Sequence, residues 1–318
     1  MRQEQESARN LSRSENIGTE KSDGKRKSSL VISKEKKNGR ELDFTVCWVI
    51  ALLSEAKPII SALKLTRTDN EAAFPIYKND VLGHLMIISG IGQNNAAGAT
   101  SYICGRYDVP AWAAWINIGI AGYAEGPLGK LFQAVKVTNE LETRVAYPGF
   151  RLPKLVPLTT LETREQPCNE YKVDTLYDME GLAFTETASR FSCNELTFLF
   201  KVVSDSNAKQ LRHINPLYVE KLLAQNINTI LLLVDAVKEL VEDEKKRLKI
   251  SQDVEVVLNK FHFTVSRKAQ LIQKYRRWKT AFPNAPFGEV YENAKSAGDV
   301  IDTMEKILSS AVFGRPNS

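Results

Sequence analysis

The sequence Tyr177-Asp178-Met179-Glu180-Gly181-Leu182-Ala183 places two carboxylates just before apolar residues that recur at helical spacing. This pattern predicts a helix whose start is capped by Asp178. The segment 196–203 is a short, continuous run of β-prone residues, which predicts a buried strand. That strand ends in Ser204-Asp205, and open α/β sheets bind their ligands at the carboxyl ends of their strands.

We therefore expect Glu180 and Asp205 to be brought to one rim of a sheet by a helix–strand unit. The alternative is purely structural. In that case Asp178 and Asp205 cap helices, and Glu180 is a solvated acid in a first helical turn.

A second rim position is expected near the start of the ordered sequence. The apolar run 44–53 predicts a strand buried on both faces, and Ser54 predicts the cap of the helix that follows. Glu55 would then lie in the first turn of that helix, at the carboxyl end of the strand.

Two further strands are expected at 73–78 and 84–89, and Pro75 predicts that the first of them lies at a sheet edge. The second strand ends in Ser89-Gly90-Ile91-Gly92, before a helix. Glycines at such a junction let backbone N–H groups approach an oxygen-rich ligand. A tight turn without a ligand explains the same sequence equally well.

The remaining pattern predicts a domain with flanking segments. Residues 1–42 are charged and lack aromatic residues, so we expect a disordered tail. We expect a domain at 43–248 and a helical extension at 249–318. Within the domain, the expected elements are strands at 112–118 and 134–139, a proline-broken loop at 147–171 with one strand near 155–159, and a long amphipathic helix at 216–246.

Composition narrows the function classes. The 318 residues carry a modest net charge of +5, so nucleic acid is not an expected partner. The longest apolar region, 111–124, is too short to span a bilayer, and we expect a cytoplasmic protein without a membrane partner. The four cysteines and three histidines are scattered, so local spacing predicts no metal site.

Four landmarks occur in a fixed order: Ala51-Leu52-Leu53-Ser54-Glu55, Ser89-Gly90-Ile91-Gly92, Asp178-Met179-Glu180-Gly181 and Ser204-Asp205, with Asn117-Ile118-Gly119-Ile120-Ala121-Gly122 between the second and third. With these motifs the chain resembles the nucleoside phosphorylase superfamily, and within it most nearly the methylthioadenosine/S-adenosylhomocysteine nucleosidases. The resemblance covers roughly residues 44–245.

The resemblance implies an α/β fold, a three-layer sandwich with a central mixed sheet, in a homodimer that binds a small nucleoside and needs no cofactor. It implies cleavage of a purine nucleoside's N-glycosidic bond through an oxocarbenium-like transition state. Asp205 matches the acid that protonates the leaving base, a role that requires a raised pKa. Glu180 matches the carboxylate that accepts hydrogen bonds from the ribose and stabilises the developing positive charge. The other matched positions are Glu55 as the base that orients the attacking water, Ser89 and Gly90 near that water, Met179 beneath the sugar and Ser204 beside Asp205.

Hydrolysis is favoured over phosphorolysis because the carboxylate of Glu55 would repel phosphate at the first loop. Two alternatives remain: a non-catalytic nucleoside-binding or regulatory module, and a phosphate-dependent phosphorylase. The chain also departs from the family pattern. The segment 158–163 lacks the aromatic residue that stacks on the base, and Ser206-Asn207-Ala208-Lys209 replaces the usual acidic continuation.

Overall fold

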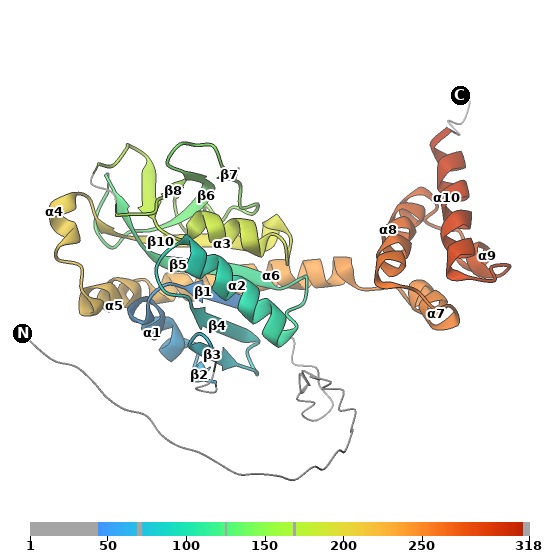
Figure 1. The fold of residues 1–318 in the computed structure, drawn as a ribbon, viewed down its shortest axis with the longest axis horizontal. Helices are drawn as coiled ribbons and strands as arrows, with labels where there is room; N and C mark the ends of the chain where they lie inside the picture. Colours follow the sequence, from blue (N-terminus) through green and yellow to red (C-terminus); the bar gives the residue numbers. More distant parts are fainter. Residues whose placement is uncertain (1–43, 69–71, 125, 168–169, 314–318) are drawn as a thin grey trace, which may run out of the picture. The chain divides into compact units, whose positions relative to one another are not determined.

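The fold is a mixed α/β structure built on one central sheet (Figure 1). The computed structural model describes residues 44–68, 72–124, 126–167 and 170–313, so the charged tail expected at 1–42 and Cys168 lie outside the described residues. The strands are β1 (Val46–Ile50), β2 (Thr66–Arg67), β3 (Ile76–Asn79), β4 (His84–Ile88), β5 (Ala114–Tyr123), β6 (Leu131–Asn139), β7 (Val145–Ala146), β8 (Leu158–Thr163), β9 (Thr175–Asp178) and β10 (Thr197–Asp205). The helices are α1 (Leu53–Ala62), α2 (Gln93–Tyr107), α3 (Gly181–Ala188), α4 (Ala208–Leu211), α5 (Pro216–Gln225), α6 (Ile227–Leu248), α7 (Gln252–Lys260), α8 (Val265–Ala281), α9 (Gly288–Tyr291) and α10 (Ala297–Phe313).

Four parallel strands form the middle of the sheet. β1 pairs with β4 on one side and with β5 on the other, and β5 pairs with β10, all in parallel. Their carboxyl ends therefore meet at one edge, as the sequence predicted. This edge is where open α/β sheets place their ligand sites.

Half of the sheet closes into a ring. β10 pairs with β6 as well as with β5, and the chain of pairings from β6 through β8 and β9 returns to β5. A closed ring has an interior, so side chains from strands that are not hydrogen bonded to each other can meet inside it.

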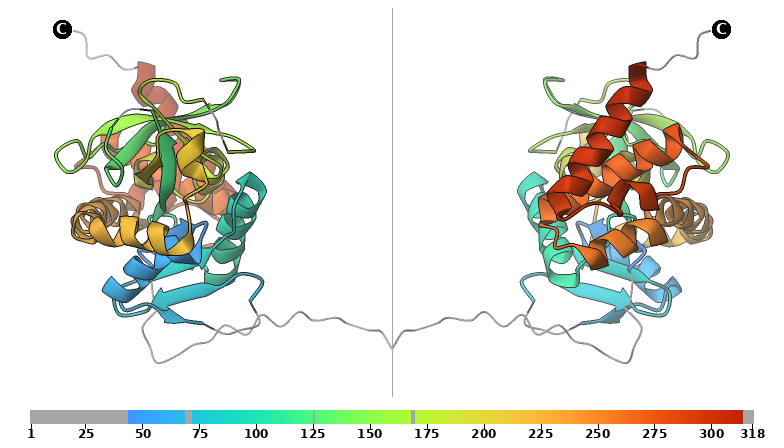
Figure 2. Two further views of the ribbon diagram at one scale, coloured as in Figure 1. Left: turned by 90° about the vertical axis from the view of Figure 1, so that its left-hand side faces the viewer. Right: turned by 90° about the vertical axis from the view of Figure 1, so that its right-hand side faces the viewer.

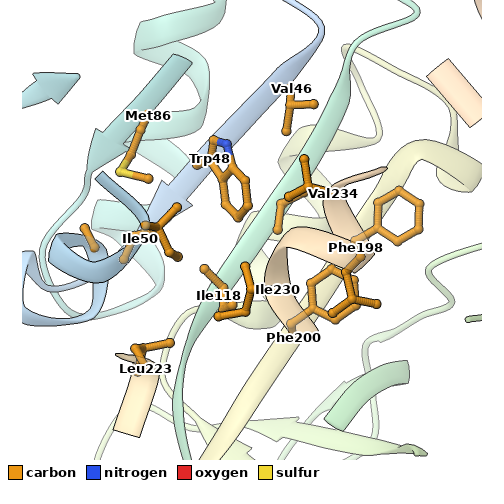
Figure 3. Packing of buried hydrophobic residues seen from close by; sticks show 14 of the residues in the cluster. Val46, Trp48, Ile50, Met86, Ile118, Phe198, Phe200, Leu223, Ile230 and Val234 are labelled. Atoms are coloured by element: carbon orange, nitrogen blue, oxygen red, sulfur yellow. The ribbon is translucent and has the colours of Figure 1, made fainter. Parts of the chain in front are cut away.

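Helices cover both faces of the sheet because its strands alternate apolar side chains between two cores. Val46, Trp48 and Ile50 of β1 pack with α1, α5 and α6, whereas Cys47 and Val49 pack with α2 and α3. Figure 3 shows the first core, where the Trp48 ring lies among Ile230, Val234 and the strand residues.

Several boundaries differ from the expectations. Asp178 lies in β9 instead of capping a helix, because α3 begins only at Gly181. Helix α1 begins at Leu53, one residue before the predicted cap Ser54. Pro75 does not mark a sheet edge, because the short strand β2 pairs with the outer side of β3.

The expected single helix at 216–246 is two helices, α5 and α6, which meet at Asn226 with a bend of 60°. The Asn226 side chain donates hydrogen bonds of 2.9 Å to the carbonyls of Gly129 and Leu222. Within the described ranges, no single helix has the length and apolar composition to cross a membrane, and α5 and α6 meet that criterion only as a bent pair.

The C-terminal helices have a hydrophobic core of their own. Its buried members all come from residues 254–308 and include Leu271, Trp278, Phe287 and Met304. Helices α8 and α10 lie side by side (Figure 2, right).

Candidate functional site

Most of the predicted site residues follow the carboxyl ends of the parallel strands that meet at the edge described above: Glu55 follows β1, Ser89 and Gly90 follow β4, and Ser204 and Asp205 end β10. Glu180 follows β9, which runs antiparallel to β5, and it reaches this edge through a hydrogen bond to the Gly92 N–H beyond β4. Glu55, Glu180 and Asp205 are each at most 7% exposed. Three buried carboxylates therefore lie on the edge of one sheet.

Glu55 is anchored by two backbone N–H groups. Its Oε2 accepts a hydrogen bond of 2.9 Å from Leu52 N, and its Oε1 accepts one of 2.9 Å from Ile120 N. The first bond closes the start of α1, and the second ties the side chain to β5. Burial raises the pKa of Glu55, although the two N–H groups and the cation of Lys201 oppose the shift.

Glu180 reaches the glycine-rich junction between β4 and α2. Its Oε1 accepts a hydrogen bond of 2.7 Å from the backbone N–H of Gly92, which has a φ of +102° and precedes the first turn of α2. This N–H was expected to approach an oxygen-rich ligand; in the structure the oxygen comes from the chain itself. The carboxylate also lies at the positive end of the α2 dipole.

Lys201 lies fully buried in the middle of β10, where it forms an ion pair with Asp178 of β9. Its Nζ is 2.7 Å from Asp178 Oδ2. The same carboxylate accepts hydrogen bonds from Thr163 Oγ1 at 2.7 Å and from Gly181 N at 2.8 Å. Because β9 and β10 are not hydrogen bonded to each other in the ring, this ion pair joins two strands across its interior.

The buried charges perturb one another. Burial, followed by the neighbouring Asp178 carboxylate, raises the pKa of Glu180 to about 7, even though Lys201 and the Gly92 N–H lower it. Burial disfavours the charged form of Lys201, but Asp178, Glu180 and Glu55 outweigh this effect and raise its pKa. Near neutral pH the cluster therefore holds a charged lysine and a Glu180 carboxyl that gains or loses its proton in this pH range.

Both carboxylate oxygens of Asp205 accept hydrogen bonds from hydroxyl groups. Ser204 Oγ donates to Oδ1 at 2.6 Å, and the Tyr171 hydroxyl donates to Oδ2. The Tyr171 ring stacks on Tyr177, with ring centroids 5.0 Å apart, and it lies so close to Gly122 that a Cβ there would overlap its hydroxyl. An aromatic ring of this chain therefore lies directly against the predicted acid.

The other predicted residues lie close to the chain's own backbone. Ser89 Oγ donates to the carbonyl of Gly90 at 2.8 Å, and the Ser89 and Gly90 N–H groups bind the carbonyls of Ile50 and Ala51. These bonds hold the junction against the end of β1. Met179 is half-buried between Asp178 and Glu180.

Sequence reasoning missed Lys201 and Tyr171. A signal for Lys201 was present, because a lone lysine inside the apolar run of β10 can be buried only with an anionic partner. Tyr171 lies outside the helices and strands, in a region read as a proline-broken loop, and its contact with Asp205 spans 34 residues. No local pattern indicates such a contact. Among the described residues, no group of three or more His, Cys, Asp or Glu side chains is arranged to hold a metal ion.

The fold matches solved structures of nucleosidases. The Helicobacter pylori 5′-methylthioadenosine/S-adenosylhomocysteine nucleosidase with butyl-thio-DADMe-Immucillin-A has 13% identity and a TM-score of 0.51, over 61% of this chain and 99% of that chain. Futalosine hydrolase of the same organism has 13% identity and a TM-score of 0.51, over 60% of this chain and 97% of that chain. Arabidopsis thaliana 5′-methylthioadenosine nucleosidase has 17% identity and a TM-score of 0.50, over 62% of this chain and 97% of that chain.

No protein-family model matches the chain, and no curated protein matches it by sequence. The expected resemblance is therefore confirmed for the fold, which the chain shares with solved nucleosidases. The chemistry of the site has to be argued from its own residues.

Proposed function

We propose that the chain hydrolyses the N-glycosidic bond of a purine nucleoside of the methylthioadenosine/S-adenosylhomocysteine type. The observation that carries the proposal is the buried cluster of Glu55, Asp178, Glu180 and Lys201, whose lysine lies on β10, the same strand that ends in Asp205. Buried carboxylates with raised pKa values are typical of sites that move protons or stabilise positive charge. The fold supports the same class of reaction, because the solved nucleosidases share it.

In the proposed reaction, water attacks the anomeric carbon as the bond to the base breaks. Asp205 gives a proton to the base nitrogen, so that the base leaves as a neutral molecule. Glu55 orients the water and takes its proton, a task that suits a carboxylate whose pKa is raised by burial. Met179, Ser89 and Gly90 are proposed to contact the sugar and the water.

Glu180 is proposed to act in its ionised form, by accepting hydrogen bonds from the ribose and stabilising the oxocarbenium-like transition state. In this mechanism Lys201 favours the ionised form of Glu180, because its charge lowers the pKa of that carboxyl. Lys201 also neutralises Asp178, which would otherwise be a buried charge without a cation.

Tyr171 must leave Asp205 before a base nitrogen can reach the carboxyl. Its hydroxyl lies at hydrogen-bonding range of Oδ2, the range that the proton-accepting nitrogen would need. Its ring stacks on Tyr177, so a nucleobase in its place would meet in Tyr177 the kind of aromatic surface that the segment 158–163 lacks. We propose that the nucleobase takes the place of the Tyr171 side chain.

The contact between Tyr171 and Asp205 also favours a second candidate, a module that binds nucleosides without turning them over. If the tyrosine keeps its bond to Asp205 when ligand is bound, the acid has no access to the base. A phosphorylase is the third candidate; the buried Glu55 carboxylate disfavours it by repelling phosphate.

The test is release of free base from a panel of purine nucleosides, with and without phosphate, by the wild type and by Asp205→Asn. We expect release without phosphate, and a loss of roughly 100-fold or more in kcat for Asp205→Asn, which cannot donate the proton. Asp302→Asn, an exposed acid of α10, serves as the matched control. Strict phosphate dependence would support the phosphorylase, and tight nucleoside binding without any release would support the binding module.

A further inference from the structure

A cavity of about 410 Å³ lies where the end of α6 meets α7 and α8, and it shares no residue with the Asp205 site. Four basic side chains line it: Arg247, Lys249, Arg276 and Lys279. None of the ten described residues that line it is acidic. The volume is in the range of small-molecule sites, which is about 300–1,000 Å³.

The chain's own acids neutralise little of this charge. Arg247 is paired with Glu244, its neighbour on α6, and Lys279 Nζ donates a 2.8 Å hydrogen bond to the carbonyl of Pro283. Within the described part of the chain, no acidic side chain is paired with Arg276 or Lys249. Concentrating the three other cations around one small cavity costs electrostatic free energy, which a multiply charged anion would offset.

Helix α8 adds to the positive potential. It contains six basic residues and no acidic residue: Arg267, Lys268, Lys274, Arg276, Arg277 and Lys279. Arg276 and Lys279 lie on the face that lines the cavity, together with Thr280. Arg267 and Lys268 lie two turns earlier on α8 and do not line it. Arg276 and Lys279 are therefore the two basic residues of α8 whose positions direct their charge at the cavity.

The N-terminus of α7 provides a second, independent attraction for anions. Ser251 lines the cavity and caps this nine-residue helix, with its side chain accepting a hydrogen bond from Val254 N. The first N–H groups of a helix carry partial positive charge. Two acidic residues, Asp253 and Glu255, lie in this first turn and offset part of that charge, but neither lines the cavity. The Asp253 carboxylate accepts a 2.8 Å hydrogen bond from the Tyr275 hydroxyl.

We propose that this cavity binds the oligophosphate group of a nucleotide-sized ligand. Guanidinium groups bind phosphate oxygens in pairs of hydrogen bonds, and ammonium groups bind them as point charges. A compact oligophosphate fits better than an extended nucleic acid because the other cations of α8 are spread around the helix instead of forming a stripe.

Calorimetric titration of the full chain with inorganic tripolyphosphate at about 50 mM salt tests the proposal, since charge attraction is only weakly screened there. Arg276→Glu/Lys279→Glu reverses two charges inside the cavity. Arg267→Glu/Lys268→Glu makes the same change in net charge on the same helix but outside the cavity. We expect binding to weaken about 30-fold or more in the first pair and less than about threefold in the second.

Absence of binding by the wild type, or equal weakening in the two pairs, would overturn the proposal. A single-stranded oligonucleotide that binds more tightly than tripolyphosphate, and loses affinity equally in the two pairs, would also overturn it in favour of general nucleic-acid attraction. Arg276→Gln/Lys279→Gln removes the two charges without reversing them. If the Arg276→Glu/Lys279→Glu variant fails to fold, the affinity of this Gln variant for tripolyphosphate tests the proposal in its place. Nucleoside hydrolysis, measured in the same variants, should be unchanged.

Discussion

One buried lysine controls the ionisation of the carboxylates around it. Lys201 is paired with Asp178, and its charge also lowers the pKa values of Glu180 and Glu55, which burial raises. A neutral Glu180 can donate a hydrogen bond but cannot stabilise a cationic sugar. The cation therefore sets the pH above which the proposed site is competent.

The pH profile of kcat/KM tests this control. In the wild type we expect activity to rise through a pH of about 7, where Glu180 becomes ionised. Lys201→Met removes the charge that lowers this pKa, so the acidic limb should move up by about one pH unit or more. Lys201→Arg keeps the charge and should keep the limb near its original position.

The matched variant separates electrostatics from folding. Removing Lys201 leaves the buried Asp178 charge without a cation and should also cost about 3–5 kcal/mol of stability. If Lys201→Met folds and its acidic limb coincides with that of the wild type, the cation does not control Glu180.

A second prediction about a single residue concerns the hydroxyl of Tyr171. Tyr171→Phe keeps the ring but removes the hydroxyl bonded to Asp205, so a nucleobase would have one bond fewer to displace. We expect the Kd for a non-hydrolysable nucleoside analogue to fall about 10-fold or more, as for one lost charge-assisted hydrogen bond. Tyr147→Phe, at an exposed tyrosine, is the control. Weaker binding in Tyr171→Phe would show instead that the hydroxyl contacts the ligand.

Among the elements, β10 shows which structural features the sequence can predict and which it cannot. Its apolar run predicted a buried strand that ends in Ser204-Asp205, and the strand runs from Thr197 to Asp205. Its length and hydrophobicity are local properties, so they could be predicted. Its pairing with both β5 and β6, which closes the ring around Lys201 and Asp178, depends on contacts between distant segments and left no local signal.

The break between α5 and α6 has a similar cause. The apolar spacing continues through Asn226, so periodicity predicts one helix. The structure bends there, and the Asn226 side chain binds the carbonyl of Gly129, which is 97 residues away in sequence. Asparagine is a common helix terminator, but only the tertiary contact selects this one as the end of α5.

Asn226→Ala tests the contribution of that contact. The variant loses both side-chain hydrogen bonds, and the free energy of unfolding should fall by about 1–2 kcal/mol. Asn293→Ala, at an exposed position in the turn between α9 and α10, should change it by less than about 0.5 kcal/mol. Urea titrations of the three proteins measure the difference. Equal stability of Asn226→Ala and the wild type would mean that the bend is held by the packing of α5 and α6 alone.

At the scale of the whole molecule, buried groups with shifted pKa values make folding stability depend on pH in opposite directions. Glu55 and Glu180 have raised pKa values, so the folded state binds their protons more readily and gains stability as the pH falls toward their unfolded values. His84 acts the other way. It is fully buried, and burial, together with the nearby Lys238 cation, lowers its pKa to about 3.

His84 should therefore dominate the loss of stability in mild acid. Its Nδ1 accepts a 3.1 Å hydrogen bond from Trp48 Nε1, which requires the neutral ring. Below the unfolded pKa of about 6.5 the unfolded chain binds a proton that the folded chain does not, so His84 should cost about 2 kcal/mol of stability at pH 5. His84→Asn keeps an acceptor near the Nδ1 position and cannot titrate. Urea titrations at pH 8 and at pH 5 give the difference in unfolding free energy between wild type and variant. This difference should be smaller at pH 5 than at pH 8 by that amount. The effects of Glu55 and Glu180 cancel in it because both proteins contain these residues. A difference that stays constant between the two pH values would mean that the folded protein accommodates a charged imidazole between β4 and α6.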